Sequence, residues 1–347
     1  MTESTLVRPE PEPARVGNLP WVWSGRIPSL DGLRALAVLS VIFSHVDRYI
    51  AGAWALGHFG VTAFFVISGF LITLLMIRER RKTGSVSVKR FYQRRALRIL
   101  PAYAALLVVV AILSAFEHYP IDRLSWIGAL TYTSCFMTAT MAPVLAHTWS
   151  LSVEEHFYFV WPLLFRICRS KIAISALAGF VLTAPLLRWE AASWNLPWID
   201  PNYSSPLQLS SIASGALLAF LVTSDVVIPA AAAASAGGAL FILSFALRVW
   251  PPVQSALADS LRAAAFGLAM LAILQIRSGN PVCKILNSKP FVVIGVLSYS
   301  LYLWQQPLAG ILVPARYGIP LLFVVATLSY RFVERPFLNF KESIPKA

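Results

Sequence analysis

Apolar stretches of 17 to 24 residues, separated by short polar segments, recur along most of the chain. A transmembrane helix needs about 20 predominantly apolar residues, so each stretch is a candidate membrane span. There are eleven candidates, at 32–50, 59–77, 99–116, 124–145, 149–168, 172–189, 205–223, 227–249, 260–276, 290–313 and 318–335. Residues 1–29 are instead polar and rich in proline, and they lack the order of regions that marks a signal peptide.

The positions of Lys and Arg indicate which stretches cross the membrane, because these residues are retained on the cytoplasmic side. The segment 78–98 holds nine basic residues and one acidic residue, which predicts a cytoplasmic loop. If 124–145 does not span, 22 of the 29 basic residues lie inside, six lie outside, and Arg34 lies within a span. We therefore predict an all-α integral membrane protein with about ten transmembrane helices in one bundle, and an outer-side re-entrant or interfacial helix at 124–145.

This topology predicts one membrane domain over 30–338, between a cytoplasmic polar tail at 1–29 and a cytoplasmic C-terminal tail at 339–347. Composition supports the membrane class, since 57% of residues are hydrophobic and 13% are charged, against about 25% charged in soluble domains. A soluble enzyme and a disordered chain are excluded. The net charge of +13 reflects cytoplasmic Lys and Arg, so no nucleic-acid partner is predicted. The three cysteines form no motif, and no metal site is predicted.

Ionisable residues inside the predicted spans are the first candidates for chemistry, because each costs about 2.5 kcal/mol or more in that environment. Arg34 and His45 are eleven residues apart, which places them about 20° apart on one helix face and roughly 16 Å apart along its axis. A structural alternative stays open for each residue. Arg34 can snorkel to the interface or pair with Asp31, and His45 can be a hydrogen-bonded packing residue.

Two adjacent carboxylates, Glu154 and Glu155, lie in the stretch 149–168. Ser152 and Glu155 match a capping box, in which Ser caps the helix start and Glu bonds back to it. Helical spacing places Glu154 on one face with Phe157, Tyr158 and Trp161. On the predicted topology Glu154 lies at the depth of His45, so the two are candidates for a general base and its orienting partner. Equal depth does not establish contact.

Arg94, Arg95 and Arg98 cluster at the inner start of the third span, where the amino terminus of a helix adds positive potential. Guanidinium groups suit phosphates, and anchoring of the loop on the cytoplasmic side is the alternative.

Gly60 and Gly69 permit close helix approach. Further candidates are weaker: Ser68 as a nucleophile, with a bond to its own helix as the commoner role; Tyr299, Tyr302 and Trp304 as packing groups; and Glu334 with Arg335 as a surface pair.

Six strings, taken in order, resemble the acyltransferase-3 family of bacterial membrane O-acyltransferases: SLDGLRALAVLSVIFSHV, FGVTAFFVISGFLIT, FYQRRALRILPAY, TWSLSVEEHFYFVWPLL, SYSLYLWQQP and LSYRFVERPF. The resemblance runs from residue 28 to about residue 338. It implies a ten-helix domain in the bacterial cytoplasmic membrane, and the distribution of Lys and Arg predicts that both termini are cytoplasmic. It also implies transfer of an acyl group, commonly acetyl from acetyl-coenzyme A, to a hydroxyl of a cell-envelope or exported carbohydrate.

The resemblance and the spacing together predict site residues, with acyl-coenzyme A as the donor substrate and no metal. The expected catalytic residues are His45 and Glu154, the expected donor-binding residues are Arg34, Arg94, Arg95 and Arg98, and the supporting candidates are Ser68, Trp149, Ser150, Glu155 and Tyr158. The chain departs from the family pattern at Thr62, often acidic, at His156, often Gln, and at Gln305, often His. Gln305 cannot titrate, so we assign it no catalytic role.

The expected partners are the lipid bilayer and a carbohydrate or other hydroxyl-bearing acceptor. The chemistry on the acceptor is expected to use the membrane domain itself or a separate periplasmic transferase. The alternative function is a membrane transporter or flippase of a glycan or lipid-linked intermediate, with the intramembrane ionisable residues in a substrate pathway.

Overall fold

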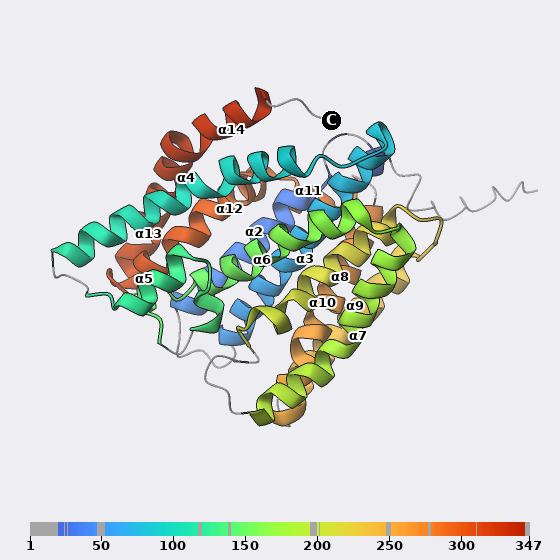
Figure 1. The fold of residues 1–347 in the computed structure, drawn as a ribbon, viewed down its shortest axis with the longest axis horizontal. Coiled ribbons are helices and arrows are strands. Elements are labelled where there is room, and N and C mark those ends of the chain that lie inside the picture. The colour runs from blue at the N-terminus through green and yellow to red at the C-terminus, as the bar shows by residue number, and fades with distance from the viewer. Residues whose placement is uncertain are drawn as a thin grey trace, which may run out of the picture.

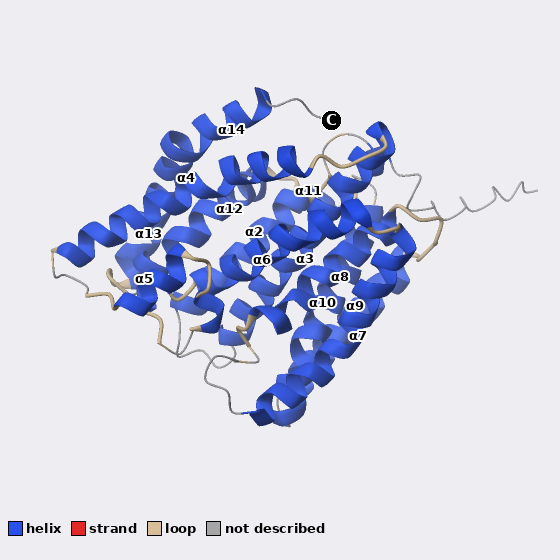
Figure 2. Ribbon diagram, in the orientation of Figure 1, coloured by secondary structure: helices blue, strands red, loops and turns tan. Residues whose placement is uncertain are grey.

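The computed structural model describes residues 20–23, 25, 27–46, 53–116, 120–137, 140–194, 200, 202–247, 251–276, 279–309 and 311–343, and all regular structure in these ranges is helical (Figure 2). In chain order the helices are α1 Pro20–Trp23, α2 Leu30–Val46, α3 Ala53–Thr83, α4 Val88–Ala115, α5 Arg123–Leu130, η2 Ser134–Phe136, η3 Pro143–Leu145, α6 Thr148–Ile167, α7 Ser170–Trp194, α8 Ser205–Val222, α9 Ala230–Ala246, α10 Pro251–Gln275, α11 Pro281–Leu286, α12 Lys289–Leu308, α13 Ala315–Leu328, η5 Ser329–Glu334 and α14 Arg335–Ser343. The elements η2 and η3 are single 3-10 turns, and η5 is π-helical.

Each of the ten stretches predicted to span overlaps a helix of the structure, namely α2, α3, α4, α6, α7, α8, α9, α10, α12 and α13. By length and apolar composition, six helical segments in the described ranges could cross a membrane: Leu56–Thr83, Val88–Ala115, Ser170–Ala191, Ser205–Val222, Ala256–Gln275 and Ala315–Lys341. The helices α2 and α9 have 17 residues each, and α6 contains the polar pair Glu154 and Glu155. The chain is therefore a multi-pass, all-helical membrane protein.

The helix α3 lies in the middle of the bundle, against α2 on one side and α8 on the other (Figure 1). A Cβ atom at Gly60 would collide with the Ser40 hydroxyl and the Ala37 carbonyl of α2. A Cβ atom at Gly69 would collide with the Ile212 carbonyl of α8. The predicted role of these two glycines in close helix approach is confirmed.

Residues 124–145 do not form the single helix that the sequence predicts. The helix α5 ends before Tyr132, whose φ of 55° is left-handed and incompatible with continuing an α-helix. The chain then folds back, and the backbone N–H of Ala142 donates to the Ser125 hydroxyl at 2.7 Å. Pro143 opens the short turn η3 just before α6. The segment is a compact loop made of three short helices.

The last part of the predicted 1–29 tail is docked on the bundle. The Arg78 guanidinium of α3 donates to the carbonyl oxygens of Trp21 and of Val22, the latter at 2.9 Å. The Arg81 guanidinium lies 3.7 Å from the centroid of the Trp23 ring. The remainder of that tail, and the end of the predicted C-terminal tail at 344–347, lie outside the described residues. Residues 335–343 form α14, which packs on α4.

Candidate active site

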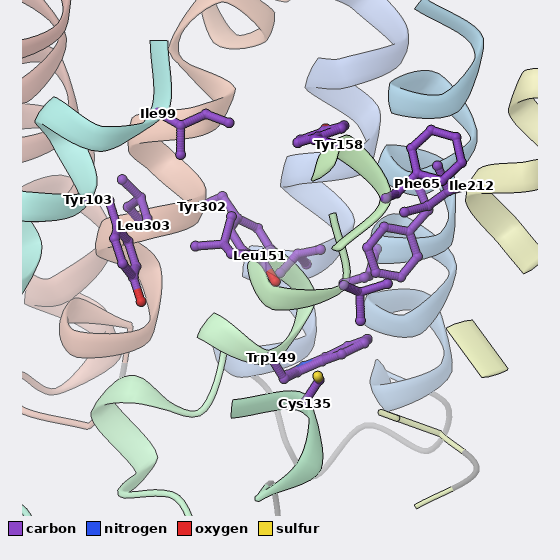
Figure 3. Packing of buried hydrophobic residues seen from close by; sticks show 14 of the residues in the cluster. Phe65, Ile99, Tyr103, Cys135, Trp149, Leu151, Tyr158, Ile212, Tyr302 and Leu303 are labelled. Carbon is purple, nitrogen blue, oxygen red and sulfur yellow. The ribbon is translucent and has the colours of Figure 1, made fainter. Parts of the chain in front are cut away.

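A cavity of about 90 Å³ lies among α2, α3, α4, α6 and α12. Its polar lining consists of Arg34, Ser68, Arg95, Arg98, Ser150, Glu154, Ser298, Tyr299 and Tyr302. Its apolar lining consists of Val61, Phe64, Phe65, Ile67, Leu71, Ile72, Ile99 and Leu151. Figure 3 shows Leu151 of α6 between Tyr302 of α12 and Phe65 of α3. In the described ranges, no three His, Cys, Asp or Glu side chains are grouped so that they could hold a metal ion.

Both oxygens of the Glu154 carboxylate accept hydrogen bonds. The Ser68 hydroxyl of α3 donates to Oε1 at 2.7 Å, and the Tyr158 hydroxyl, one turn along α6, donates to Oε2 at 2.9 Å. The expectation that Glu154 lies beside aromatic rings is confirmed for Tyr158. Ser68 bonds across helices and not to a carbonyl of α3, which is the opposite of its commoner role in a helix.

The arginines of α4 do not share one environment. Arg95 and Arg98 line the cavity, whereas Arg94 is not in its lining. The Arg95 guanidinium lies 3.6 Å from the centroid of the Tyr158 ring, a cation–π contact worth about 0.5–2 kcal/mol. Arg34 reaches the same cavity from α2. Three of the four predicted donor-binding arginines therefore line the same cavity as Glu154.

His45 lies at the opposite end of α2 from Arg34, as the helical spacing predicts. Its Nδ1 lies 2.8 Å from the Val41 carbonyl oxygen. A carbonyl only accepts, so Nδ1 carries the proton in the neutral imidazole and Nε2 is the basic nitrogen. His45 is not among the described residues that line the cavity, and the two Glu154 oxygens bond to Ser68 and Tyr158.

The supporting candidates Ser150 and Trp149 lie in the first turn of α6. The hydroxyl oxygens of Ser150 and Tyr302 are 2.5 Å apart, and both side chains line the cavity. Trp149 is buried and packs edge-on against Phe65, with 5.9 Å between ring centroids. Tyr302, which the sequence suggested as a packing group, is therefore also a polar group of the cavity.

The predicted capping box at the start of α6 is wrong. The helix begins at Thr148, one turn before Ser152, which the sequence suggested as the N-terminal cap. Ser152 is therefore an interior residue of α6 and cannot cap its start. The Ser152 hydroxyl donates to the Thr148 carbonyl at 3.1 Å, inside the helix. Glu155 is half-buried in the second turn of α6 and has no capping role.

The three departures from the family pattern have local partners. The Thr62 hydroxyl donates to the His58 carbonyl at 2.9 Å, and His156 Nδ1 lies 2.8 Å from the Ser205 hydroxyl. Gln305 is fully buried, and its Nε2 donates to Gln306 Oε1 at 3.3 Å. These positions lie outside the lining of the cavity.

Glu334 is not in a surface pair with Arg335, as the sequence suggested. It is buried, and the Ser300 hydroxyl of α12 donates to its carboxylate. The π-helical turn η5 contains an extra residue per turn, which rotates Glu334 toward the bundle. Glu334 also interacts electrostatically with Arg98 and Arg34. A π-turn has no sequence signature here, so only the presence of an acid in an apolar stretch could have marked this residue.

Two of the six basic residues assigned to the outer side, Arg188 and Arg262, are buried between helices. Arg188 of α7 donates to the Ser260 hydroxyl at 2.9 Å and to the Leu207 carbonyl at 2.8 Å. Arg262 of α10 pairs with Asp259 at 3.0 Å, an i, i+3 spacing that the sequence contained. These groups link α7, α8 and α10 away from the cavity, and the sequence interpretation missed them.

Comparison with known proteins identifies the same family along most of the chain. The family described as an acyltransferase domain matches residues 27–330. A peptidoglycan O-acetyltransferase, OatA, of Listeria monocytogenes is 30% identical over 362 residues, which cover 90% of this chain and 57% of that protein. The O-acetyltransferase OatA of Staphylococcus aureus is 27% identical over 348 residues, covering 89% and 57%. A putative O-acetyltransferase of S. aureus strain COL is 30% identical over 369 residues, covering 90% and 57%.

The chain thus spans little more than half the length of these relatives. No solved structure matches it.

Proposed function

Because the chain belongs to the acyltransferase domain family, we propose that it is an integral-membrane O-acyltransferase. It moves an acyl group, most simply acetyl, from acyl-coenzyme A to a hydroxyl of a cell-envelope or exported carbohydrate. The observation that carries this proposal is that Arg34, Arg95 and Arg98 line one cavity together with the hydrogen-bonded pair Ser68 and Glu154. A polyanionic donor and a polar reaction centre are both accommodated by that lining.

The proposed topology has ten transmembrane helices in the cytoplasmic membrane, with both termini cytoplasmic and 124–145 on the outer side. The excess of Lys and Arg in the loops assigned to the cytoplasm supports this orientation. It places Arg34, near the start of α2, toward the cytoplasm and His45 toward the outside. A topology reporter fused after Ala142 should report the outer side, and a cytoplasmic signal at that position would refute this arrangement.

Arg34, Arg95 and Arg98 bind the phosphates of the donor in this proposal, and Arg94 contributes from outside the lining. Guanidinium groups offer paired donors that match phosphate oxygens. Arg95 Nε is buried and has no hydrogen-bond partner in the described part of the chain, so it is available to a ligand. The acyl thioester then extends along the cavity toward Glu154.

His45 acts on the acceptor in the proposed mechanism. Its Nε2, left basic by the contact of Nδ1 with the Val41 carbonyl, takes the proton of the attacking hydroxyl. Glu154 provides negative charge inside the cavity, where Ser68 and Tyr158 fix its orientation. The acceptor enters from the outer side, on the membrane domain alone or with a separate periplasmic transferase.

The acceptor class follows from the relatives. One of them is named for peptidoglycan, so peptidoglycan fragments are the first acceptor to test, followed by other envelope glycans. The purified chain in lipid nanodiscs should transfer labelled acetyl from acetyl-coenzyme A to such an acceptor. His45→Ala should reduce transfer by about 100-fold or more, the typical loss for a general base.

The matched control is His156→Gln, which changes a half-buried histidine outside the cavity and should leave transfer unchanged. Two results would contradict the proposal. One is full activity in the His45 variant, which removes His45 from the mechanism. The other is movement of a glycan across vesicles with no acyl transfer to any acceptor, which would make the protein a transporter.

A further inference from the structure

Hydroxyl groups in the helices of this protein mostly donate to carbonyls of their own helix. Thr62 on α3 donates to His58, Ser214 on α8 donates to Ser210, and Ser44 on α2 donates to Val41, at 2.7 to 2.9 Å. This back-bonding is the ordinary way to satisfy Ser and Thr inside a helix. Ser68 instead donates across the bundle to the carboxylate of Glu154 at 2.7 Å, and Ser300 likewise donates to the carboxylate of Glu334.

Ser68 also occupies a particular depth. It lies at the midpoint of α3, equally far from Ala53 and Thr83, and it lines the cavity that the three arginines share. The contact of Gly69 with the backbone of α8 fixes this part of α3 in place. The Ser68 oxygen is therefore held inside the cavity, with its proton directed at a carboxylate and its lone pairs available to a ligand.

The cavity contains the other groups that acyl transfer to a serine requires. A nucleophile needs a base within hydrogen-bond reach, and the base needs a third group to orient it. Glu154 is the base, and the Tyr158 hydroxyl orients it at 2.9 Å. The hydroxyls of Ser150 and Tyr302 lie in the same lining and can donate to a carbonyl oxygen that becomes negative in the transition state.

A covalent carrier would also solve a problem set by the proposed topology. Coenzyme A is a cytoplasmic donor, and the proposed acceptor lies outside. Arg34 and His45 are roughly 16 Å apart along α2. Donor phosphates bound at Arg34 and an acceptor hydroxyl bound at His45 therefore occupy different positions. A covalent acyl-enzyme at Ser68 lets the donor leave before the acceptor reacts.

We propose that Ser68 is the nucleophile that carries the acyl group between acyl-coenzyme A and the acceptor. This inference rests on the proposed function. The bond from Ser68 Oγ to the acyl carbon forms and the carbon–sulfur bond of the thioester breaks. The serine proton moves to Glu154 and then to the departing sulfur, which leaves as coenzyme A thiol. In the second step the acceptor oxygen bonds to the acyl carbon and His45 takes its proton. The serine oxygen leaves and accepts a proton through Glu154, with which it is in contact, and His45 then releases the proton that it gained, so each residue returns to its starting state.

The test is isotope exchange in the absence of any acceptor. Purified full-length chain is mixed with acetyl-coenzyme A and tritiated coenzyme A. A covalent acyl-enzyme exchanges the label into acetyl-coenzyme A, whereas direct transfer to an acceptor cannot. Ser68→Ala should lower the exchange rate by about 100-fold or more and retain binding of acetyl-coenzyme A. Ser214→Ala is the matched control, because that serine donates to the Ser210 carbonyl of its own helix, and exchange should be unchanged.

A second measurement identifies the attached group. After acid quenching, mass spectrometry of the wild-type chain should locate acetyl on the peptide containing Ser68. In Ser68→Cys the adduct should become a thioester, cleaved by neutral hydroxylamine, while the wild-type oxygen ester resists it. A serine that only supports Glu154 would show neither the adduct nor this change in lability.

The outcomes separate this inference from the function on which it rests. Transfer to an acceptor without exchange, exchange that persists in Ser68→Ala, or acetyl on another residue would each overturn the role of Ser68 and leave the acyltransferase proposal standing. A wild-type chain that neither binds acetyl-coenzyme A nor transfers acetyl would refute both. Exchange that disappears only in the Ser68 variant, with acetyl recovered on that peptide, supports the carrier.

Discussion

Replacing Tyr158 with phenylalanine isolates one hydrogen bond in the proposed active site. The change removes the hydroxyl that donates to Glu154 Oε2 at 2.9 Å and retains the ring on which Arg95 lies at 3.6 Å. A hydrogen bond to a charged group contributes about 1.5–3 kcal/mol. If that energy is lost from the transition state, kcat should decrease by about 10- to 150-fold. The Michaelis constant for acetyl-coenzyme A should stay near the wild-type value, because the contact to Arg95 persists.

Steady-state kinetics of the purified chain at varied acetyl-coenzyme A measure both parameters. Tyr158→Ala removes the ring as well, so it should also raise the Michaelis constant. Tyr103→Phe is the control, since the Tyr103 hydroxyl donates to the Ala129 carbonyl outside the cavity. Wild-type kcat in Tyr158→Phe would refute the claim that this hydroxyl orients Glu154. Equal Michaelis constants for the two Tyr158 variants would refute the role of the ring.

Three further predictions concern the donor, the acceptor and the packing of the bundle. Arg98→Ala should weaken binding of acetyl-coenzyme A by calorimetry more than the exposed control Arg90→Ala, and equal affinities would assign the cluster to anchoring alone. His45→Ala should retain isotope exchange between coenzyme A and acetyl-coenzyme A while losing transfer to the acceptor; loss of exchange would move His45 into the donor step. Gly69→Ala should destabilise the bundle by about 1–3 kcal/mol through overpacking, seen as a lower thermal midpoint than in Gly179→Ala, where the added Cβ meets open space.

Local sequence patterns predicted the helices and selected three arginines that line one cavity. An apolar stretch of suitable length specifies a helix by itself, so each of the ten stretches overlaps a helix. Arg34, Arg95 and Arg98 could be selected because charged groups are rare in such stretches, and all three reach one cavity. The alternative in which Arg34 serves only at the interface does not explain that convergence.

Contacts between distant helices could not be obtained in the same way. Ser68 and Glu154 are 86 positions apart, and their hydrogen bond depends on how α3 and α6 pack. Depth in the membrane suggested His45 as the partner of Glu154, whereas the Glu154 oxygens accept hydrogen bonds from Ser68 and Tyr158. Depth alone contains no information about the position of a helix around the bundle. The inward rotation of Glu334 depends on a π-helical turn that composition does not indicate.

The charges around the cavity favour the donor over the acceptor as its occupant. Arg34, Arg95 and Arg98 line it with one carboxylate, Glu154. Asp31 and Glu154 also act electrostatically on Arg34, and Glu154 acts on Arg98. Glu334 acts on two of them only through longer-range electrostatics. Buried charge without a partner is costly, so an excess of guanidinium groups favours an anionic ligand. We therefore propose that the phosphates of acyl-coenzyme A supply that charge, and that a neutral sugar acceptor binds toward His45.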